Sequence, residues 1–424
     1  MTPTPQTLAD LRAGRLAGAT NVDLRHCQLD EFPRELFDLA DTLEQLDLSG
    51  NPLRTLPDDL PRLDALRTLF CSNCAFETLP AVLGRCAQLD LVGFRANAIA
   101  HVPHEALHAN LRWLILSGNR VDALPDSIGA CKRLQKLALA GNRLRALPKG
   151  IENLESLELL RLSANDFATW SDALPAGLLA LPRLTWLAYA GNPFTLAQEA
   201  RAAQTAPIAA ISWSALRVGE LLGQGASGHI HAARWHTITG DDRPVAVKLF
   251  KGEVTSDGLP GSEMAACIAA GVHAHLIGVE GRIVDHPQGV QGLVLGLIPP
   301  HYRSLAGPPS LASCSRDVYA ADRRFTATQA RAIATGTRDA LAHLHARGVM
   351  HGDFYGHNIL VDDAGHALLG DFGAASFLPV DDDVRADALT RIDRRAVAVL
   401  LDELAQRCDD PAALADLKSS QPGR

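Results

Sequence analysis

In the first half of the chain, apolar residues recur in one frame, written out in full as Leu43-x-x-Leu46-x-Leu48-x-x-Asn51-x-Leu53. Copies of the frame follow one another about every 23 residues, beginning at Leu66, Leu89, Leu111, Leu134, Leu157 and Leu184, after a degenerate copy around Val22. The Leu-x-Leu alternation is the period of a short strand with one buried face, and the later apolar positions bury against the next coil. Because one copy has no core of its own, the pattern predicts about eight stacked coils.

The frame also places an asparagine at the end of the strand, where its amide can hydrogen-bond backbone groups in a buried turn. This residue recurs as Asn51, Asn97, Asn119, Asn142, Asn165 and Asn192. The whole motif resembles the leucine-rich repeat. The resemblance implies an α/β solenoid over residues 20–200, with an N-terminal cap over residues 1–19.

The cysteine pair Cys71-x-x-Cys74 is typical of metal or redox sites when it stands alone. Here Cys71 occupies a core leucine position and Cys74 the asparagine position of the frame, which favours structural cysteines. Trp113 and Trp186 precede core leucines, so we expect them on the opposite, concave face of the strands. There they would either anchor a partner or cover sheet surface.

From about Trp213 the frame stops, and we expect a linker over residues 201–213 and a second domain over residues 214–424. A chain of 424 residues with 47% hydrophobic and 21% charged residues fits two packed domains. Its apolar runs stay below the roughly 20 residues of a membrane span, and its first twenty residues contain no secretory core. The sequence therefore predicts a cytoplasmic protein without a membrane span.

Composition also indicates the state of the cysteines and the classes of partner that the chain could bind. The eight cysteines are scattered without a disulfide framework, so we expect reduced thiols and no disulfides. A net charge of −8 and a pI near 6.0 argue against broad attraction to nucleic acid and favour a protein or small-molecule partner.

The second domain opens with a glycine-rich segment that reads Leu222-Gly223-Gln-Gly225-Ala-Ser-Gly228-His-Ile230. Glycines at this spacing form a turn whose backbone N–H groups can approach phosphate oxygens, although dinucleotide-binding turns have a similar spacing. A short apolar strand then ends in Lys248, and the alanine-rich helical segment EMAACIAAG opens with Glu263. A buried lysine needs a partner, which Glu263 can supply.

Two further motifs follow, His351-Gly-Asp353-Phe-Tyr-Gly-His-Asn358 and Asp371-Phe372-Gly373. Glycine turn, strand lysine, helix glutamate, catalytic-loop residues and the Asp-Phe-Gly triplet occur in the order and at the intervals typical of protein kinases. The chain thus resembles a bacterial-type leucine-rich-repeat protein kinase. The resemblance implies an α+β domain of two lobes, residues 214–298 and 299–424, with a reduced C-lobe.

The resemblance also implies roles for individual residues. Asp353 would orient the acceptor hydroxyl and take its proton, while Lys248, fixed by Glu263, would hold the ATP phosphates. Asn358 and Asp371 would bind Mg²⁺ or Mn²⁺. The other ATP-binding positions are Leu222, Gly223, Gly225, Gly228 and Ile230. Structural support would come from His351, Phe372, Gly373 and Asp393, the last of which opens an amphipathic helix and caps the catalytic loop.

The sequence departs from the family at two catalytic-loop positions. Gly352 stands where many kinases have an arginine that pairs with a phosphorylated activation loop, so activation by that ion pair is not expected. Tyr355 stands where serine/threonine kinases usually have a lysine. The segment between Asp371 and Asp393 is also short.

Three functions are compatible with these patterns. The first is an ATP-dependent protein kinase, with a serine or threonine acceptor favoured and with repeats that recruit a protein substrate or partner on their concave face. The second is a catalytically weak or inactive nucleotide-binding scaffold. The third is a small-molecule phosphotransferase, because His-Gly-Asp is also similar to the catalytic loop of antibiotic phosphotransferases.

Overall fold

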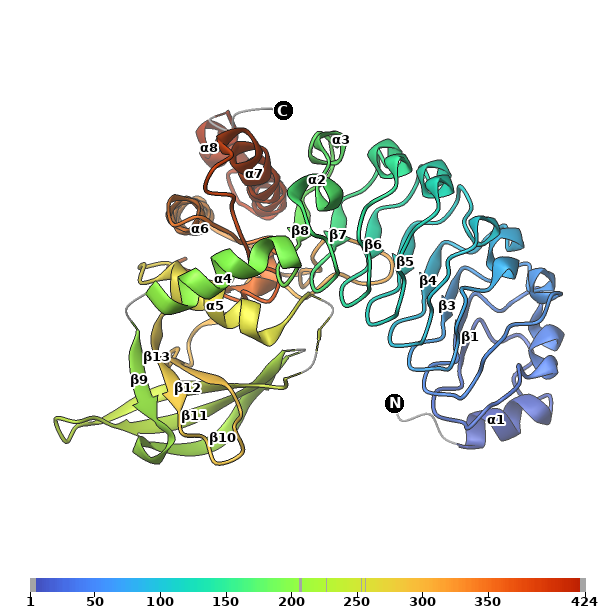
Figure 1. The fold of residues 1–424 in the computed structure, drawn as a ribbon, viewed down its shortest axis with the longest axis horizontal. Coiled ribbons are helices and arrows are strands. Elements are labelled where there is room, and N and C mark those ends of the chain that lie inside the picture. Colours follow the sequence, from blue (N-terminus) through green and yellow to red (C-terminus); the bar gives the residue numbers. More distant parts are fainter. Residues whose placement is uncertain (1–4, 206–207, 226, 253, 256, 420–424) are drawn as a thin grey trace. The chain divides into compact units, whose positions relative to one another are not determined.

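The structure is a computed structural model that describes residues 5–205, 208–225, 227–252, 254–255 and 257–419 (Figure 1). It divides into two compact units, residues 1–184 and residues 185–424. Within the described ranges, no helix is both long enough and apolar enough to span a membrane.

The first unit is a stack of short parallel strands joined by 3₁₀ turns on the outer side (Figure 1). Each strand pairs in register with the next, so that core leucines such as Leu46 and Leu69 lie side by side. The helices and strands are α1 (Pro5–Arg12), β1 (Asn21–Asp23), β2 (Gln45–Asp47), β3 (Thr68–Phe70), β4 (Leu91–Gly93), β5 (Trp113–Ile115), β6 (Lys136–Ala138), β7 (Leu159–Arg161), α2 (Trp170–Ala173) and α3 (Ala176–Leu179). The 3₁₀ turns are Arg34–Leu39, Leu60–Arg62, Ala81–Arg85, His104–Ala106, Asp126–Ala130 and Lys149–Asn153.

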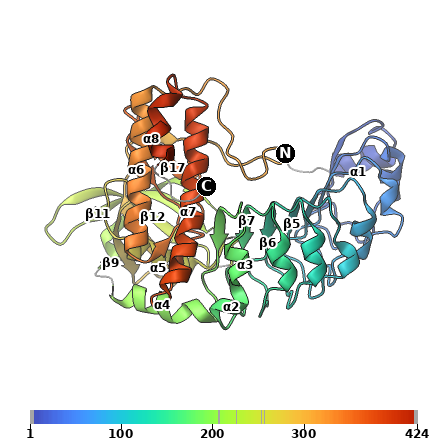
Figure 2. The ribbon, with the colours of Figure 1, turned by 90° about the horizontal axis from the view of Figure 1, so that it is seen from above.

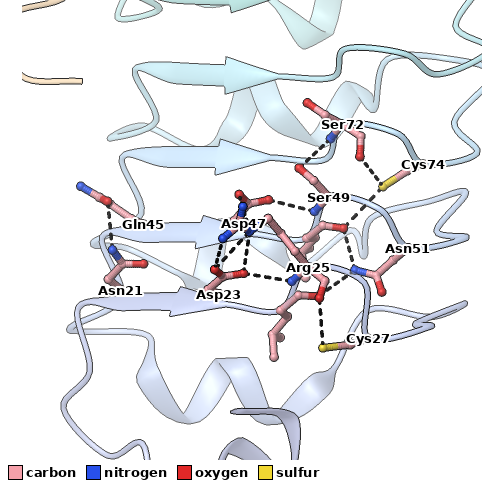
Figure 3. Close-up of polar contacts among 12 residues, drawn as sticks. Asn21, Asp23, Arg25, Cys27, Gln45, Asp47, Ser49, Asn51, Ser72 and Cys74 are labelled. Atoms are coloured by element: carbon pink, nitrogen blue, oxygen red, sulfur yellow. Dashed lines mark hydrogen bonds and ion pairs between the residues drawn. The ribbon is translucent and has the colours of Figure 1, made fainter. Parts of the chain in front are cut away.

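A ladder of asparagines closes the turns of this stack, and Figure 3 shows its first member, Asn51. The amide nitrogen of Asn51 donates to the carbonyl oxygens of Leu24, at 2.9 Å, and Leu48, at 2.7 Å. Its Oδ1 accepts the backbone N–H of Leu29 at 3.0 Å. The same pattern recurs at Asn119, Asn142 and Asn165. The predicted role of the asparagine position is confirmed.

The cysteine pair takes up the positions that the frame gives it. Cys71 is fully buried in the core of the stack. The Cys74 Sγ donates to the carbonyl oxygen of Leu48 at 3.5 Å, as an asparagine amide does in other copies (Figure 3). Both are free thiols that serve packing and turn closure.

Of the two expected roles for Trp113, anchoring a partner or covering sheet surface, the structure agrees with the second. Only 6% of its surface is accessible, and the Lys136 ammonium of the next strand lies 4.7 Å from the centre of its ring. Because the lysine covers the ring, this tryptophan forms a cation–π contact within the sheet.

The second unit begins with a strand and a helix that belong in sequence to the last repeat, β8 (Trp186–Ala188) and α4 (Pro193–Thr205). The sequence assigns this stretch to the repeat domain and the linker, and the predicted domain limits stay predictions. In Figure 1, α4 lies beside α5 (Pro260–Ala270), and the two helices are in contact.

A six-stranded sheet forms the N-terminal part of the second unit, with strand order β10-β11-β12-β14-β13-β9. Its buried core includes Val245, Val247 and Val294 on adjacent strands. The strands are β9 (Ala209–Ser212), β10 (Leu216–Gln224), β11 (Gly228–His236), β12 (Asp242–Phe250), β13 (Val279–Val284) and β14 (Gly292–Gly296), with a 3₁₀ turn at Trp213–Ala215.

The C-terminal part is mainly helical, and its long helices α6 and α7 lie side by side (Figure 2). A capping box of Thr326 and Gln329 starts α6. The predicted helix at Asp393 is the second half of α7, which begins at Asp383. The elements are β15 (Arg303–Ser304), α6 (Ala327–Ala346), β16 (Val349–Met350), β17 (Ile359–Val361), β18 (Ala367–Leu369), β19 (Ser376–Phe377), α7 (Asp383–Ala405) and α8 (Ala415–Ser419), with 3₁₀ turns at Gly356–Asn358 and Pro411–Leu414.

These elements confirm the predicted fold class. A leucine-rich α/β solenoid is followed by an α+β unit whose first lobe is a sheet with one flanking helix and whose second lobe is a reduced helical part.

Candidate active site

A cavity of about 180 Å³ lies within the second unit, between the six-stranded sheet, α5 and the Asp-Phe-Gly triplet. The predicted site residues that line it are Gly225, Gly228, Ile230, Lys248, Glu263, Asp371, Phe372 and Gly373. The cavity is also lined by Ser227, Thr255, Asp257, Cys267, Ile277, Val279, Leu293, Leu295 and Gly370. Leu222 and Gly223 are not in this lining, and Leu222 is 49% exposed.

The glycine turn joins β10 to β11 above this cavity. At Gly228 a Cβ atom would lie 2.4 Å from the carbonyl oxygen of Leu249, so a side chain is excluded there. Gly225 donates its N–H to the carbonyl oxygen of Gly228 at 3.0 Å, and Lys251 Nζ donates to the Gly225 carbonyl oxygen at 2.9 Å. The backbone of the turn therefore lies close to the strands that carry it.

Lys248 and Glu263 meet inside the cavity. The central strand β12 places Lys248 opposite Ile230 and Leu293, and its Nζ forms an ion pair with the Glu263 carboxylate of α5. The Lys248 side chain is 13% exposed and that of Glu263 is 2% exposed. Burial alone would lower the pKa of Lys248, but the negative charges of Glu263 and Asp371 outweigh it and raise the pKa above its ordinary value. The lysine is therefore a buried ammonium.

Asn358 holds Asp353 from the end of the same loop. Its Nδ2 donates to the backbone carbonyl oxygen and to Oδ2 of Asp353, both at 2.9 Å. The carbonyl oxygen of Asn358 accepts the N–H of Gly370 at 3.0 Å, which joins this loop to the residue before Asp371. The loop and the Asp-Phe-Gly triplet are thus fixed to each other through backbone contacts.

Asp393 anchors the start of the loop from α7. Its fully buried carboxylate accepts the backbone N–H groups of His351, at 2.8 Å, and Gly352, at 2.9 Å. The ring of His345 lies 3.0 Å from it. Burial raises the pKa of Asp393, but these hydrogen bonds and the nearby histidines outweigh burial and lower it. The carboxylate therefore stays ionised and stabilises the loop backbone.

The Asp-Phe-Gly triplet has a left-handed turn at its first residue. Asp371 has a φ of 54°, and its Oδ1 accepts the N–H of Gly373 at 3.2 Å. Phe372 is buried, and its ring centre lies 5.4 Å from that of His351, whose Nε2 is 3.0 Å from the Gly370 carbonyl oxygen. A non-glycine residue in this conformation is held by its surroundings, as is common at functional sites.

The side chains available for a divalent cation are those of Asn358 and Asp371. Among the residues that the structure describes, no group of three or more His, Cys, Asp and Glu side chains is arranged as a metal site. Magnesium, however, usually takes one or two carboxylates together with phosphate oxygens of a substrate. Because Nδ2 of Asn358 donates to Asp353, its Oδ1 is the amide atom that could coordinate a cation together with the Asp371 carboxylate. This donor set fits a hard cation.

Comparisons with known proteins agree with the geometry. A family model described as a protein kinase domain matches residues 216–391, and leucine-rich-repeat models match residues 42–63 and 109–167. The chain carries leucine-rich repeats followed by a protein kinase domain.

Individual relatives cover parts of this arrangement. The chain is 32% identical to CBL-interacting protein kinase 13 of Oryza sativa over 48% of its own length and 36% of that protein. It is 29% identical to the serine/threonine-protein kinase PkaB of Streptomyces coelicolor over 39% of its own length and 38% of that protein. A solved leucine-rich-repeat protein of Leptospira interrogans, LIC12759, is 29% identical with a TM-score of 0.40, covering 46% of this chain and 54% of that one. The chain spans less than two fifths of the length of the first curated relatives it matches.

In the second unit, Trp186 of β8 contacts the loop that carries Asp353, which the sequence did not predict. Its ring stacks on that of Tyr355 at 4.1 Å between centres, and its Nε1 donates to the carbonyl oxygen of Phe354 at 3.1 Å. Only 1% of Trp186 is exposed, so it is a covered side chain and not an exposed anchor for a partner. Tyr355, where serine/threonine kinases usually have lysine, is thus a packing partner of the tryptophan.

The second departure, Gly352, has a steric cause. Its φ is 71°, and a Cβ atom would lie 2.3 Å from the Leu187 carbonyl oxygen and 2.8 Å from that of Ala374. An arginine does not fit between these two backbone segments. Tyr355 and Gly352, the two departures from the kinase pattern, both contact β8. They are the sequence signals that could have indicated β8 as a part of this unit.

A loop before α6 also contacts the loop that carries Asp353. Asp317 accepts a hydrogen bond from the His357 ring at 2.6 Å, and Tyr319 donates to Glu403 of α7 at 3.1 Å. Burial opposes the charging of His357, but Asp317 outweighs it and raises the pKa of the imidazole. Burial and the charge of Asp317 raise the pKa of Glu403 to about 7. This loop had no assignable role from the sequence.

Proposed function

We propose that the chain is an ATP-dependent protein kinase that transfers the γ-phosphate of ATP to a protein hydroxyl, with serine or threonine favoured. The observation that carries the proposal is the buried Lys248–Glu263 pair, which lines one cavity together with Asp371 and the glycine turn. The relatives with serine/threonine kinase names support the acceptor class.

Phosphoryl transfer depends mainly on positioning and on neutralising charge. In this proposal the Lys248 ammonium holds phosphate oxygens, and Glu263 keeps it in place. Asp353, held by Asn358, orients the acceptor hydroxyl and accepts its proton. Asn358 and Asp371 would hold magnesium, which offsets phosphate charge when it is bound.

The repeats would recruit a protein substrate or partner. Stacked repeats with a continuous strand face are typical of protein-binding surfaces, and the first unit has this architecture. Recruitment by the repeats would add to recognition at the reduced C-lobe.

The test is incubation of the purified chain with magnesium and γ-labelled ATP, followed by measurement of label on protein. Asp353→Asn should lower the rate of transfer by about 10²-fold or more, the usual contribution of a positioned base, while ATP still binds. Lys248→Met should also abolish labelling. Asp363→Asn, an exposed aspartate in a nearby turn, serves as the matched control and should label like the wild type. Transfer that persists in Asp353→Asn would show that the base is assigned wrongly.

The nucleotide-binding scaffold is the second candidate, because Tyr355 stands where serine/threonine kinases usually have a lysine and the C-lobe is reduced. Both departures would weaken transfer without removing the residues that would hold ATP and magnesium. Calorimetric titration with Mg·ATP separates the two candidates. Binding without any label on protein or added protein substrates would favour the scaffold.

A further inference from the structure

Helix α4, at the end of the last repeat, is joined to α5 by a buried hydrogen bond. Glu199 is 6% exposed, and its Oε2 accepts the hydroxyl of Ser262 at 2.6 Å. Its Oε1 accepts the backbone N–H of Gly191 at 2.8 Å. Ser262, itself 5% exposed, directly precedes Glu263 in α5. Both oxygens of one buried carboxylate are therefore used to connect β8, α4 and α5.

The same stretch also holds the segment after the Asp-Phe-Gly triplet. Gln198 Nε2 donates to the carbonyl oxygen of Leu378 at 2.6 Å, and the Tyr189 hydroxyl donates to that of Phe377 at 3.0 Å. The backbone N–H of Tyr189 donates to Ser376 Oγ at 3.1 Å. Residues 186–199 thus contact α5, the catalytic loop and strand β19.

The position of α5 decides whether the Lys248–Glu263 pair can form, because the lysine is on the central strand and the glutamate is on the helix. The N-cap residue of α5, Leu259, makes no side-chain capping hydrogen bond. Next to it, a Cβ atom on Gly191 would lie 2.8 Å from the Leu259 side chain, so the turn after β8 closely approaches this helix end. The Glu199–Ser262 bond is a polar anchor of α5 one residue from Glu263.

We propose that Glu199 is a positioning residue for the kinase site: through Ser262 it holds α5 where Glu263 meets Lys248. In many kinases an arginine at the position of Gly352 binds a phosphorylated activation segment and so helps to order the site. This chain has no arginine there, and in our proposal Glu199 orders the site without phosphorylation of that segment. This inference rests on the proposed kinase function for its effect on turnover, but not for its effect on the ion pair.

A double-mutant cycle distinguishes positioning from simple loss of stability. Glu199→Gln and Ser262→Ala should each lower kcat/KM for Mg·ATP by about tenfold, the lower range for a hydrogen bond to a charged group. In a Glu263→Ala background the same changes should alter kcat/KM by less than about twofold, because the route through Glu263 is already lost. Gln204→Ala, an exposed position on the same helix, should leave kcat/KM unchanged.

A second readout does not require turnover. The rate of acetylation of Lys248 by acetic anhydride, followed by peptide mass spectrometry, reports whether the amine is held in its ion pair. Glu199→Gln and Ser262→Ala should each raise this rate by about tenfold, to the rate that Glu263→Ala alone gives. Combining either change with Glu263→Ala should raise the rate no further. Acetylation of Lys418, which forms an ion pair with Asp402 in the same unit, is the internal control for unfolding of that unit.

The outcomes separate the two proposals. A wild-type chain that labels protein, with unchanged kcat/KM and unchanged Lys248 acetylation in both variants, overturns the positioning role and leaves the kinase function standing. A wild-type chain that transfers no phosphate, with the expected acetylation pattern, overturns the kinase function and supports the positioning role. Equal losses of kcat/KM with and without Glu263 would show a structural effect alone and would also overturn the inference.

Discussion

At the scale of single residues, Gly352 shows how a neighbouring backbone dictates a catalytic-loop residue. We expect Gly352→Ala to lower the free energy of unfolding by about 3 kcal/mol or more, from left-handed strain plus overlap with the Leu187 carbonyl oxygen. Gly348 has nearly the same φ, 72°, but no atom within 4 Å of its Cβ position, so Gly348→Ala should cost only about 1 kcal/mol. Denaturant unfolding of the two variants measures the difference, and equal losses would contradict the steric account.

Glu403 gives the kinase domain a pH-dependent stability. Its pKa of about 7 in the folded chain exceeds the ordinary 4.5, so between these values the folded state binds more protons than the unfolded state. Stability from this group is therefore complete below pH 4.5 and falls as the pH rises towards 7, by about 3 kcal/mol in total. Glu403→Gln should remove this decline in unfolding experiments from pH 5 to pH 8. The adjacent Asp402→Asn variant is the control, and a decline that survives in Glu403→Gln would refute the assignment.

At the scale of elements, the asparagine ladder makes some repeat positions more important than others. Asn142→Ala removes three hydrogen bonds to backbone groups of Val121, Leu116 and Leu139, so we expect a loss of about 3 kcal/mol. Cys74→Ala removes only weak thiol contacts and should cost about 1 kcal/mol. Hydrogen exchange of the strand amides on either side of each site reports the local loss, and similar losses at both sites would contradict the ladder argument.

The elements also show what could be predicted from the sequence. The repeat strands could be predicted because they follow a local period. Lys248 and Glu263 could be predicted from the order of motifs along the chain. Trp186 and Glu199 could not be predicted, because their contacts join residues far apart in the sequence. For Trp186, the repeat frame also offered a sufficient reason for its presence. Thr255, Cys267 and Leu293 of the cavity lining were missed for a similar reason, because their side chains come together only when the strands pair and α5 packs.

The course of α7 illustrates the limit of periodicity at element ends. Apolar spacing identified the half from Asp393 onward, whereas the helix begins at Asp383 with Asp382 as its N-cap. The first turns carry exposed Val384 and several charged residues, so no apolar stripe marks them. A side-chain cap, not burial, sets that end of the helix.

At the scale of the whole molecule, the contacts of β8 and α4 predict where the kinase domain can be separated. Trp186, Leu187 and Tyr189 are at most 1% exposed, and Trp186 and Tyr189 donate hydrogen bonds to residues of the second unit. Burial of a large apolar side chain stabilises a fold by about 1.5–3 kcal/mol, so removal of these three would cost of order 5 kcal/mol. This loss is comparable to the whole free energy of unfolding of a domain. A shortened chain of residues 185–424 should therefore unfold cooperatively and keep Mg·ATP-dependent labelling. A chain of residues 214–424, cut at the boundary that the sequence predicts, should melt far lower or not fold. Calorimetry and labelling of both chains decide the matter. If the shorter chain melts within a few degrees of the longer one and labels equally, then the end of the repeat array is an appendage and not a part of the kinase fold.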